Sequence, residues 1–266
     1  MDGTRAPEPT PAPVVSVVLA TYNERQNLPE LLERLRRPTL PPWEVLVVDD
    51  GSTDGTREYA LEQAEIDPRV RPVFHDGKQT TLGAQCQGIL ATRGSLVVVM
   101  DADLQHPPEL LPEMVHALED GAALVVASRY TGDGSPGPRS PLRAVISRSA
   151  EWMAKILLPE ARRVTDPVSG YFAFRRAVFR PLDPRYRGYK LLLFLLVMTR
   201  GAEVREVGFR FEPRASGASK VAQGLAFVRV FLVEVILARR LERTLRGGNP
   251  PPIATPEPEA RSRESI

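Results

Sequence analysis

Apolar runs of strand length alternate with segments of helical periodicity through the first half of the chain. The runs are rich in β-branched residues and end in polar ones, which predicts strands at residues 14–19, 45–48, 70–74, 96–100 and 124–127. Between them, apolar residues recur at i, i+3 and i+4, which predicts crossover helices at residues 27–35, 56–66, 82–91 and 109–118. This alternation is typical of βαβ units and predicts an α/β fold with a mainly parallel, buried sheet.

The pattern changes after Tyr130. A segment rich in Gly, Pro and Ser, residues 131–141, predicts a long loop that works as a flexible lid. The elements expected after it are a helix at 142–157, an apolar core helix at 191–198, a strand at 203–211 and a C-terminal helix at 221–246. The predicted organisation is a disordered Pro-rich tail (1–13), one α/β domain (14–220), an apolar and basic helix (221–246) and a second disordered tail (247–266).

Composition narrows the class of protein. The chain has 266 residues, enough for one large domain, and its formal net charge of +2 is too small for the positive field of a nucleic-acid-binding protein. A single cysteine, Cys86, excludes an internal disulfide and a cysteine-based zinc cage, which favours a reducing compartment. The N-terminal segment lacks the pattern of a secretory signal, and no apolar run reaches the roughly 18–20 residues that cross a bilayer. We therefore expect a cytoplasmic protein without a nucleic-acid partner.

Polar side chains gather directly after three of the predicted strands, at residues 21–24 (TYNE), 49–50 (DD) and 101–103 (DAD). In an open α/β sheet, ligands bind beyond the carboxyl ends of the strands. The three clusters are therefore expected to face one crevice.

Asp101, Asp103 and Gln105 alternate in sequence at the end of a buried run, so on an extended backbone all three side chains would point the same way. Two carboxylates and an amide oxygen suit a hard cation such as Mg²⁺ or Mn²⁺. The histidines, His75, His106 and His116, form no i, i+4 pair of the zinc type. The cluster therefore suits a magnesium or manganese site, although Asp-x-Asp taken by itself is more often a turn at the end of a strand or a helix cap.

Six motifs in order resemble a known family. TYNE, VVDDGSTDGT, MDADLQHPPE and SRY are similar to the family 2 glycosyltransferases with the GT-A fold, a Rossmann-like single domain. DPVSGYFAFRR and FEPRASGASK narrow the resemblance to the polyprenyl-phosphate sugar transferases of the dolichyl-phosphate mannosyltransferase kind, over about residues 14–220. The resemblance implies inverting, metal-dependent transfer of mannose from GDP-mannose to a polyprenyl phosphate. A UDP-glucose-dependent glucosyltransferase and, more remotely, an inactive nucleotide-sugar-binding scaffold subunit are the alternatives.

The resemblance also implies roles for single residues. It implies a pocket for base and ribose at Ala20, Tyr22, Glu24, Val48 and Asp50, with Ala20 standing where the family usually has proline. It implies metal and diphosphate contacts at Asp101, Ala102, Asp103 and Gln105, and a distal basic pair on the donor at Arg214 and Lys220. It implies acceptor-phosphate contacts at Arg129, Arg143, Ser147, Asp166 and Ser169, with Arg129 also facing the donor. For Asp166 and Ser169, an Asx turn before a tight glycine turn is the alternative. The implied catalytic set is Asp103, Arg129 and Arg143.

The implied acceptor also bears on the mechanism. A phosphate monoester has a second pKa near about 6 and is already anionic at pH 7, so its attack needs no dedicated general base. We expect in-line displacement with inversion, with Arg129 and Arg143 orienting the incoming phosphate. For Lys190, two readings stay open: an acceptor contact or a surface charge beside a helix.

The C-terminal helix, residues 221–246, is apolar on most sides and carries a basic run at its end, Arg239, Arg240, Arg243 and Arg246. An exposed helix of this kind would leave a large apolar area in water. Its basic run favours anionic lipid headgroups, which predicts attachment to the cytoplasmic face of a membrane or recruitment by a separate membrane protein. Docking on the α/β domain and self-association are the alternatives.

Overall fold

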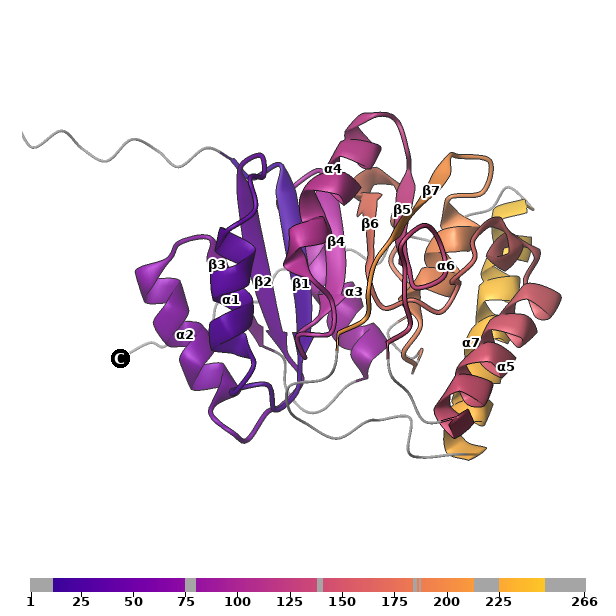
Figure 1. Ribbon diagram of the computed structural model, residues 1–266, viewed down its shortest axis with the longest axis horizontal. Helices are drawn as coiled ribbons and strands as arrows, with labels where there is room; N and C mark the ends of the chain where they lie inside the picture. Colours follow the sequence, from indigo (N-terminus) through magenta and orange to yellow (C-terminus); the bar gives the residue numbers. More distant parts are fainter. Residues whose placement is uncertain are drawn as a thin grey trace, which may run out of the picture.

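The computed structural model describes residues 12–74, 80–137, 141–183, 186, 188–212 and 225–246, with the backbone alone for 141–143 and 225–228. Its strands form one 7-stranded sheet in the order β3-β2-β1-β4-β6-β5-β7 (Figure 1). The strands are β1 (Val15–Thr21), β2 (Trp43–Asp49), β3 (Val70–Phe74), β4 (Leu96–Asp101), β5 (Leu124–Ser128), β6 (Phe172–Arg175) and β7 (Val204–Gly208). Only β6 runs antiparallel to its neighbours, β4 and β5. The predicted α/β fold with a mainly parallel sheet is therefore confirmed.

Helices cover both faces of the sheet. They are α1 (Leu28–Arg36), α2 (Thr56–Ile66), α3 (Thr81–Ala91), α4 (Leu111–Glu119), α5 (Pro141–Leu157), α6 (Leu191–Met198) and α7 (Leu225–Arg246), with the 3-10 turns η1 (Pro108–Leu110), η2 (Pro159–Arg163) and η3 (Arg176–Val178). Successive strand residues point to opposite faces and build two cores. One core packs against α1, α2 and α4, and the other against α3, α5, α6 and α7.

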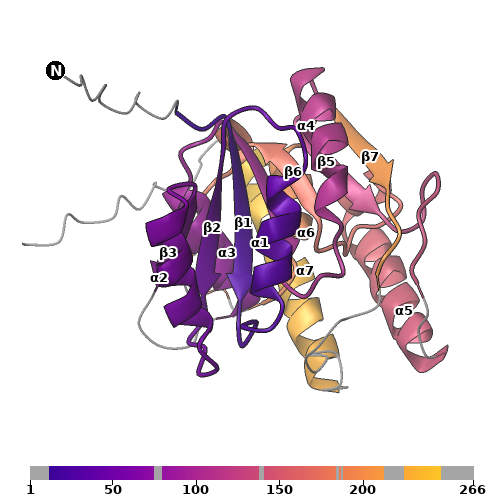
Figure 2. The same ribbon diagram turned by 60° about the vertical axis from the view of Figure 1, so that its left-hand side comes forward.

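Helix α7 docks on the α/β domain. Its side chains Phe231, Val235 and Ala238 are buried in the core shared with α6, whose residues from Leu191 to Val197 are all buried. The prediction that residues 191–198 form a core helix is confirmed. Helices α5 and α7 contact each other and lie at the end of the sheet away from α2 and β3 (Figures 1 and 2).

Several predicted boundaries were wrong. Strand β6 was missed because it is only four residues long and lies inside a motif that gives no alternating pattern. The predicted helix at 109–118 is a 3-10 turn followed by α4. The strand predicted at 203–211 ends at Gly208, after which the Ser135 amide donates to the Phe209 carbonyl and the Phe211 amide donates to the Ser135 carbonyl. Residues 1–11, 138–140 and 247–266 lie outside the described part of the chain, and so do the predicted disorder of both tails and the tip of the predicted lid.

Candidate active site

The three polar clusters lie at one edge of the sheet, as predicted. Strand β1 pairs in parallel with both β2 and β4, and the register aligns Ala20 with Val48 on one side and with Asp101 on the other. One step on, Thr21 is opposite Asp49. The predicted pocket residues therefore share one row at the carboxyl edge.

The loops after β1 and β2 are bonded to each other. The Asp50 amide donates to the Thr21 carbonyl at 2.9 Å, and the Glu24 amide donates to the Thr56 hydroxyl at 2.9 Å. Asn23, in the left-handed region at φ 57°, accepts a hydrogen bond from the Thr53 amide on its side-chain oxygen. These bonds fix the backbone that carries Tyr22, Glu24 and Asp50, so this part of the site is built before a ligand arrives.

The chain turns within the predicted metal motif instead of staying extended. It bends after Asp101, and Leu104 has a φ of 64°. The Gln105 amide donates to the Asp103 carboxylate at 3.2 Å, a local turn that competes with an extended strand. The expectation of three side chains alternating along an extended backbone was therefore wrong.

Gln105 has a second partner that the sequence did not reveal. Its side-chain Nε2 donates to the Glu212 carbonyl at 3.1 Å, and the Glu212 amide donates to the Gln105 carbonyl at 3.2 Å. Arg34 also reaches Glu212, with Nη1 at 3.2 Å from Oε2. Glu212 is thus tied to the predicted metal motif, whereas Arg214 and Lys220 lie outside the described ranges.

The donor atoms in this motif fit a hard cation that also binds substrate. Within the part of the chain that the structure describes, no three His, Cys, Asp or Glu side chains cluster as a metal site. Besides Asp101 and Asp103, the Oε1 atom of Gln105 is the remaining oxygen ligand that the motif offers. A cation held here would therefore complete its coordination with water and substrate oxygens, the usual habit of Mg²⁺ and Mn²⁺.

A buried histidine, His106, holds the backbone of Asp101. The backbone amide of Asp101 donates to Nδ1 of His106 at 3.0 Å, so that nitrogen is unprotonated. Burial lowers the pKa of His106, and its ring stacks on Tyr171 at 5.1 Å between centroids. At Gly170 an added Cβ would lie 3.1 Å from Asp101 Oδ2 and 3.3 Å from His106 Cε1, so a larger residue there would require these side chains to shift by a few tenths of an ångström. Sequence reasoning used His106 only to exclude zinc.

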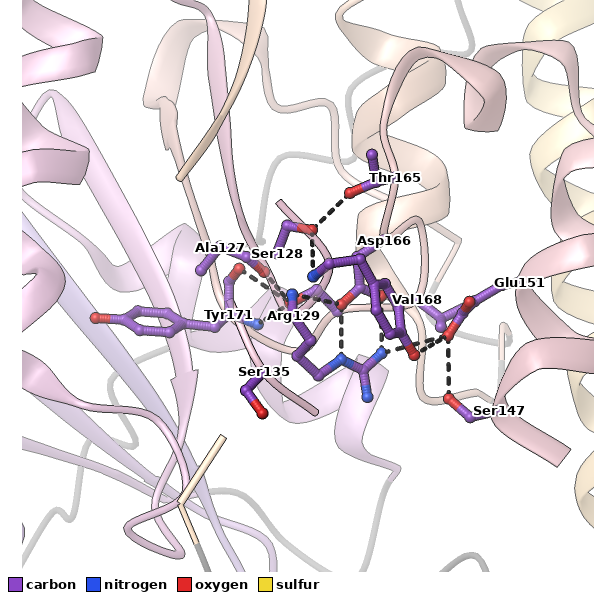
Figure 3. Close-up of polar contacts among 12 residues, drawn as sticks. Ala127, Ser128, Arg129, Ser135, Ser147, Glu151, Thr165, Asp166, Val168 and Tyr171 are labelled. Carbon is purple, nitrogen blue, oxygen red and sulfur yellow. Dashed lines mark hydrogen bonds and ion pairs between the residues drawn. The ribbon is translucent and has the colours of Figure 1, made fainter. Parts of the chain in front are cut away.

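Arg129 is held by a buried carboxylate. Its Nε and Nη2 donate to Asp166 at 2.6 and 2.7 Å (Figure 3). The Asp166 residue is 0% exposed. Burial alone would lower the pKa of Arg129, but the bond to Asp166 raises it, so the guanidinium stays charged. The pair presents a cation whose orientation is already set.

Ser169, the other predicted site residue in the segment 166–171, makes its hydrogen bonds to backbone atoms. The Ser169 hydroxyl donates to the Ala127 carbonyl at 2.7 Å and accepts from the Tyr171 amide at 3.2 Å. A carboxylate such as Asp166 repels phosphate, so the contacts in the structure favour a different role from the implied acceptor contact. Asp166 and Ser169 hold residues 166–171 against β5 and orient Arg129.

Helix α5 brings a second carboxylate to this cluster. Glu151 Oε1 accepts from the Tyr130 hydroxyl at 2.6 Å and from Ser147 at 3.1 Å, and it lies 3.9 Å from Arg129 (Figure 3). Burial and the bond to Glu151 raise the pKa of Tyr130. Arg143 precedes Ser147 by one turn on the same helix, although its side chain is not described. Glu151 was missed; its spacing of four from Ser147 was the available signal.

Lys190 points into the site. Its Nζ donates to the Val168 carbonyl at 2.8 Å, and burial lowers its pKa while the carboxylates of Asp101 and Asp166 act in the opposite direction. The surface-charge reading of Lys190 is therefore wrong. Together with Arg129, this ammonium gives the site two cations beside the acidic pair Asp101 and Asp103, an arrangement suited to binding several phosphate groups around one metal ion.

Comparisons with known proteins identify the family of the chain. Residues 16–182 match the model of the family described as Glycosyl transferase family 2. The chain is 38% identical over 208 residues to the dolichol-phosphate mannosyltransferase of Pyrococcus furiosus, covering 78% of this chain and 59% of that protein. It is 36% identical over 218 residues to the polyprenol monophosphomannose synthase of Mycolicibacterium smegmatis, covering 77% of this chain and 80% of that one. The chain thus spans less than two thirds of the Pyrococcus relative.

A solved structure supports the fold. The crystal structure of glucosyl-3-phosphoglycerate synthase from Mycobacterium tuberculosis, in complex with Mn²⁺, uridine diphosphate and glucosyl-3-phosphoglycerate, superposes with a TM-score of 0.63 at 22% identity, over 90% of this chain and 81% of that one. The predicted GT-A fold is confirmed. From its family match and its relatives, this chain belongs to glycosyl transferase family 2 and is a glycosyltransferase.

Proposed function

We propose that this glycosyltransferase moves mannose from GDP-mannose to the phosphate of a polyprenyl or dolichyl phosphate. The observation that carries the proposal is the combination of an acidic pair, Asp101 and Asp103, with two oriented cations, Arg129 and Lys190. A nucleotide diphosphate and a phosphate acceptor bring several negative charges together, which such a site can neutralise. The names of the relatives, a dolichol-phosphate mannosyltransferase and a polyprenol monophosphomannose synthase, support the choice of sugar and acceptor.

The acidic motif would hold Mg²⁺ or Mn²⁺ through Asp101, Asp103 and Gln105. Bound there, a divalent cation supplies positive charge that stabilises the departing diphosphate. The donor pocket would consist of Ala20, Tyr22, Glu24, Val48, Asp50 and Ala102, with Arg214 and Lys220 on the diphosphate. The fixed loops after β1 and β2 would orient the nucleotide.

The acceptor phosphate would be oriented by Arg129, Arg143 and Ser147. Because the phosphate is already anionic near pH 7, its attack needs no dedicated general base. Asp166 and Glu151 would hold the Arg129 guanidinium in position and would not contact the phosphate. Attack in line with the leaving diphosphate would invert the anomeric centre.

The test follows labelled sugar from GDP-mannose or UDP-glucose into a lipid-soluble product, with a short polyprenyl phosphate as acceptor. We expect transfer from GDP-mannose, loss of transfer when EDTA removes divalent cations, and recovery on adding Mg²⁺ or Mn²⁺. Transfer from UDP-glucose alone would keep the reaction class and replace the donor. Ala20, which stands in the proposed base pocket where the family usually has proline, leaves room for this outcome. Binding of both nucleotides without transfer would support the scaffold alternative and contradict the proposal.

We also propose that α5 and α7 attach the enzyme to the cytoplasmic face of a membrane, where the acceptor lies. No helix in the described ranges combines the length and the hydropathy of a membrane span. The two helices nevertheless expose large apolar side chains, Val145, Trp152, Ile156, Val233 and Ile236. On α5 the first three recur at helical spacing, on the face opposite Ser147 and Glu151. An exposed apolar stripe of this kind favours an interfacial position.

Trp152→Glu is expected to reduce binding to vesicles of anionic phospholipid at least about tenfold, since Trp152 is 70% exposed and a charge opposes burial in the interface. Co-sedimentation measures the bound fraction. Leu61→Glu, at an exposed apolar residue on α2, is the matched control and should bind as the wild type does. Equal binding of both variants and the wild type would contradict the membrane proposal.

A further inference from the structure

Helix α7 contributes a buried carboxylate to the N-terminus of α6. Glu234 is 1% exposed and lies among the core residues of α7. Its Oε1 accepts hydrogen bonds from the backbone amides of Tyr189 and Lys190, at 2.5 and 2.7 Å. Lys190 is the N-cap residue of α6, and its side chain makes no capping bond. Glu234 therefore satisfies amides at the start of α6 from a different helix.

The backbone of Gly188, which precedes these two amides, is also held by its neighbours. A Cβ added at Gly188 would collide with the Glu234 carboxylate, so a larger residue there would displace that carboxylate. The Gly188 amide donates to the Thr80 hydroxyl at 3.3 Å, and its carbonyl accepts from the Leu82 amide at 3.0 Å. The segment from Gly188 to Lys190 is thus fixed between α3 and α7.

That segment determines where the Lys190 ammonium lies. From its fixed backbone, Lys190 extends to the Val168 carbonyl at 2.8 Å, in the same loop as Asp166. The charges that act on it include Arg129, Asp101, Asp166 and Glu234 itself. Hydrogen bonds therefore lead from α7 through Lys190 to the segment that also carries Asp166, the partner of Arg129.

We propose that Glu234 is a positioning residue for the transfer reaction: by capping α6, it places the Lys190 ammonium where phosphate groups of the substrates are bound. Turnover then depends on the docking of α7, the helix that also exposes an apolar surface. The inference rests on the proposed function of the site as a binder of phosphate groups. In this role Glu234 acts through Lys190 and does not itself contact the substrates.

The test compares Glu234→Gln, Glu234→Ala, Lys190→Met and the double variant Glu234→Ala/Lys190→Met in the full-length protein. Glutamine keeps an oxygen acceptor for both amides, so Glu234→Gln should retain kcat within about threefold, whereas Glu234→Ala should lower kcat at least about tenfold. Because Glu234 acts through Lys190, the double variant should match Lys190→Met within about twofold. Glu242→Ala, which removes another buried carboxylate of α7, should lower the Tm and leave kcat unchanged.

A second readout does not depend on the identity of donor or acceptor. We titrate inorganic diphosphate with Mn²⁺ and follow binding by calorimetry. Diphosphate should bind at least about fivefold more weakly to Glu234→Ala and to Lys190→Met than to the wild type. It should bind the double variant no more weakly than it binds either single variant. Additive losses, a glutamine variant as impaired as the alanine variant, or diphosphate affinity and kcat both unchanged in Glu234→Ala would overturn the proposal. Absence of transfer by the wild type would instead count against the proposed function, and the diphosphate titration would still decide the role of Glu234.

Discussion

Asp103→Asn is expected to lower the rate of sugar transfer by about 10³-fold, the largest effect on activity that we predict. The substitution removes one of the two carboxylates of the proposed metal site and leaves the shape of the side chain unchanged. It also keeps the Oδ1 atom that accepts from the Gln105 amide at 3.2 Å, so the turn that follows Asp103 should persist. The loss should therefore come from the charge and not from unfolding.

Two measurements separate these causes for Asp103→Asn. The Tm without ligands should stay within about 2 °C of the wild type, which corresponds to less than about 1 kcal/mol for a chain of this size. Added Mn²⁺ with GDP should raise the Tm of the wild type and not that of the variant. Asp133→Asn, at an exposed residue, is the matched control and should behave as wild type in both. Retention of more than about a tenth of the activity would sink the metal assignment of Asp103.

The place of the site could be predicted because the sequence marks where strands end. The apolar runs that stop near Ala20, Val48 and Met100 belong to parallel strands, and parallel strands put their carboxyl ends at one edge. The alternation of strands and helices likewise predicted the α/β fold class. Neither inference required knowledge of a contact between distant residues.

The partners of the site residues could not be predicted in the same way. Glu151 reaches Arg129 from α5, and Glu234 reaches Lys190 from α7, through packing between segments far apart in the chain. The turn at Leu104 was hidden because Asp103 bonds the Gln105 amide locally, against the alternating pattern. For Asp166 the motif gave the position, and only the bidentate contact with Arg129 shows what the carboxylate does.

Breaking the contact between Asp166 and Arg129 is expected to cause the largest loss of stability. Asp166→Asn should lower the free energy of unfolding by about 3–5 kcal/mol, because it leaves the Arg129 guanidinium largely buried without its carboxylate. At roughly 2–4 °C per kcal/mol for 150–250 residues, the Tm should fall by at least about 6 °C. Transfer should also drop, since Arg129 loses the bidentate partner that orients it. Glu33→Gln, which breaks the exposed pair of Glu33 with Arg37, is the control and should cost less than about 1 kcal/mol.

The double variant Asp166→Asn/Arg129→Gln separates the structural from the catalytic share of this pair. The double variant no longer holds a buried guanidinium without its bidentate carboxylate, so it should be more stable than Asp166→Asn alone. Its transfer activity should not recover, because the cation proposed to bind phosphate is gone. Thermal unfolding and the transfer assay on the same preparations decide the point. Recovery of activity together with stability would mean that Arg129 serves the fold alone, and a double variant no more stable than the single one would mean that the unpaired charge is not the cause of the loss.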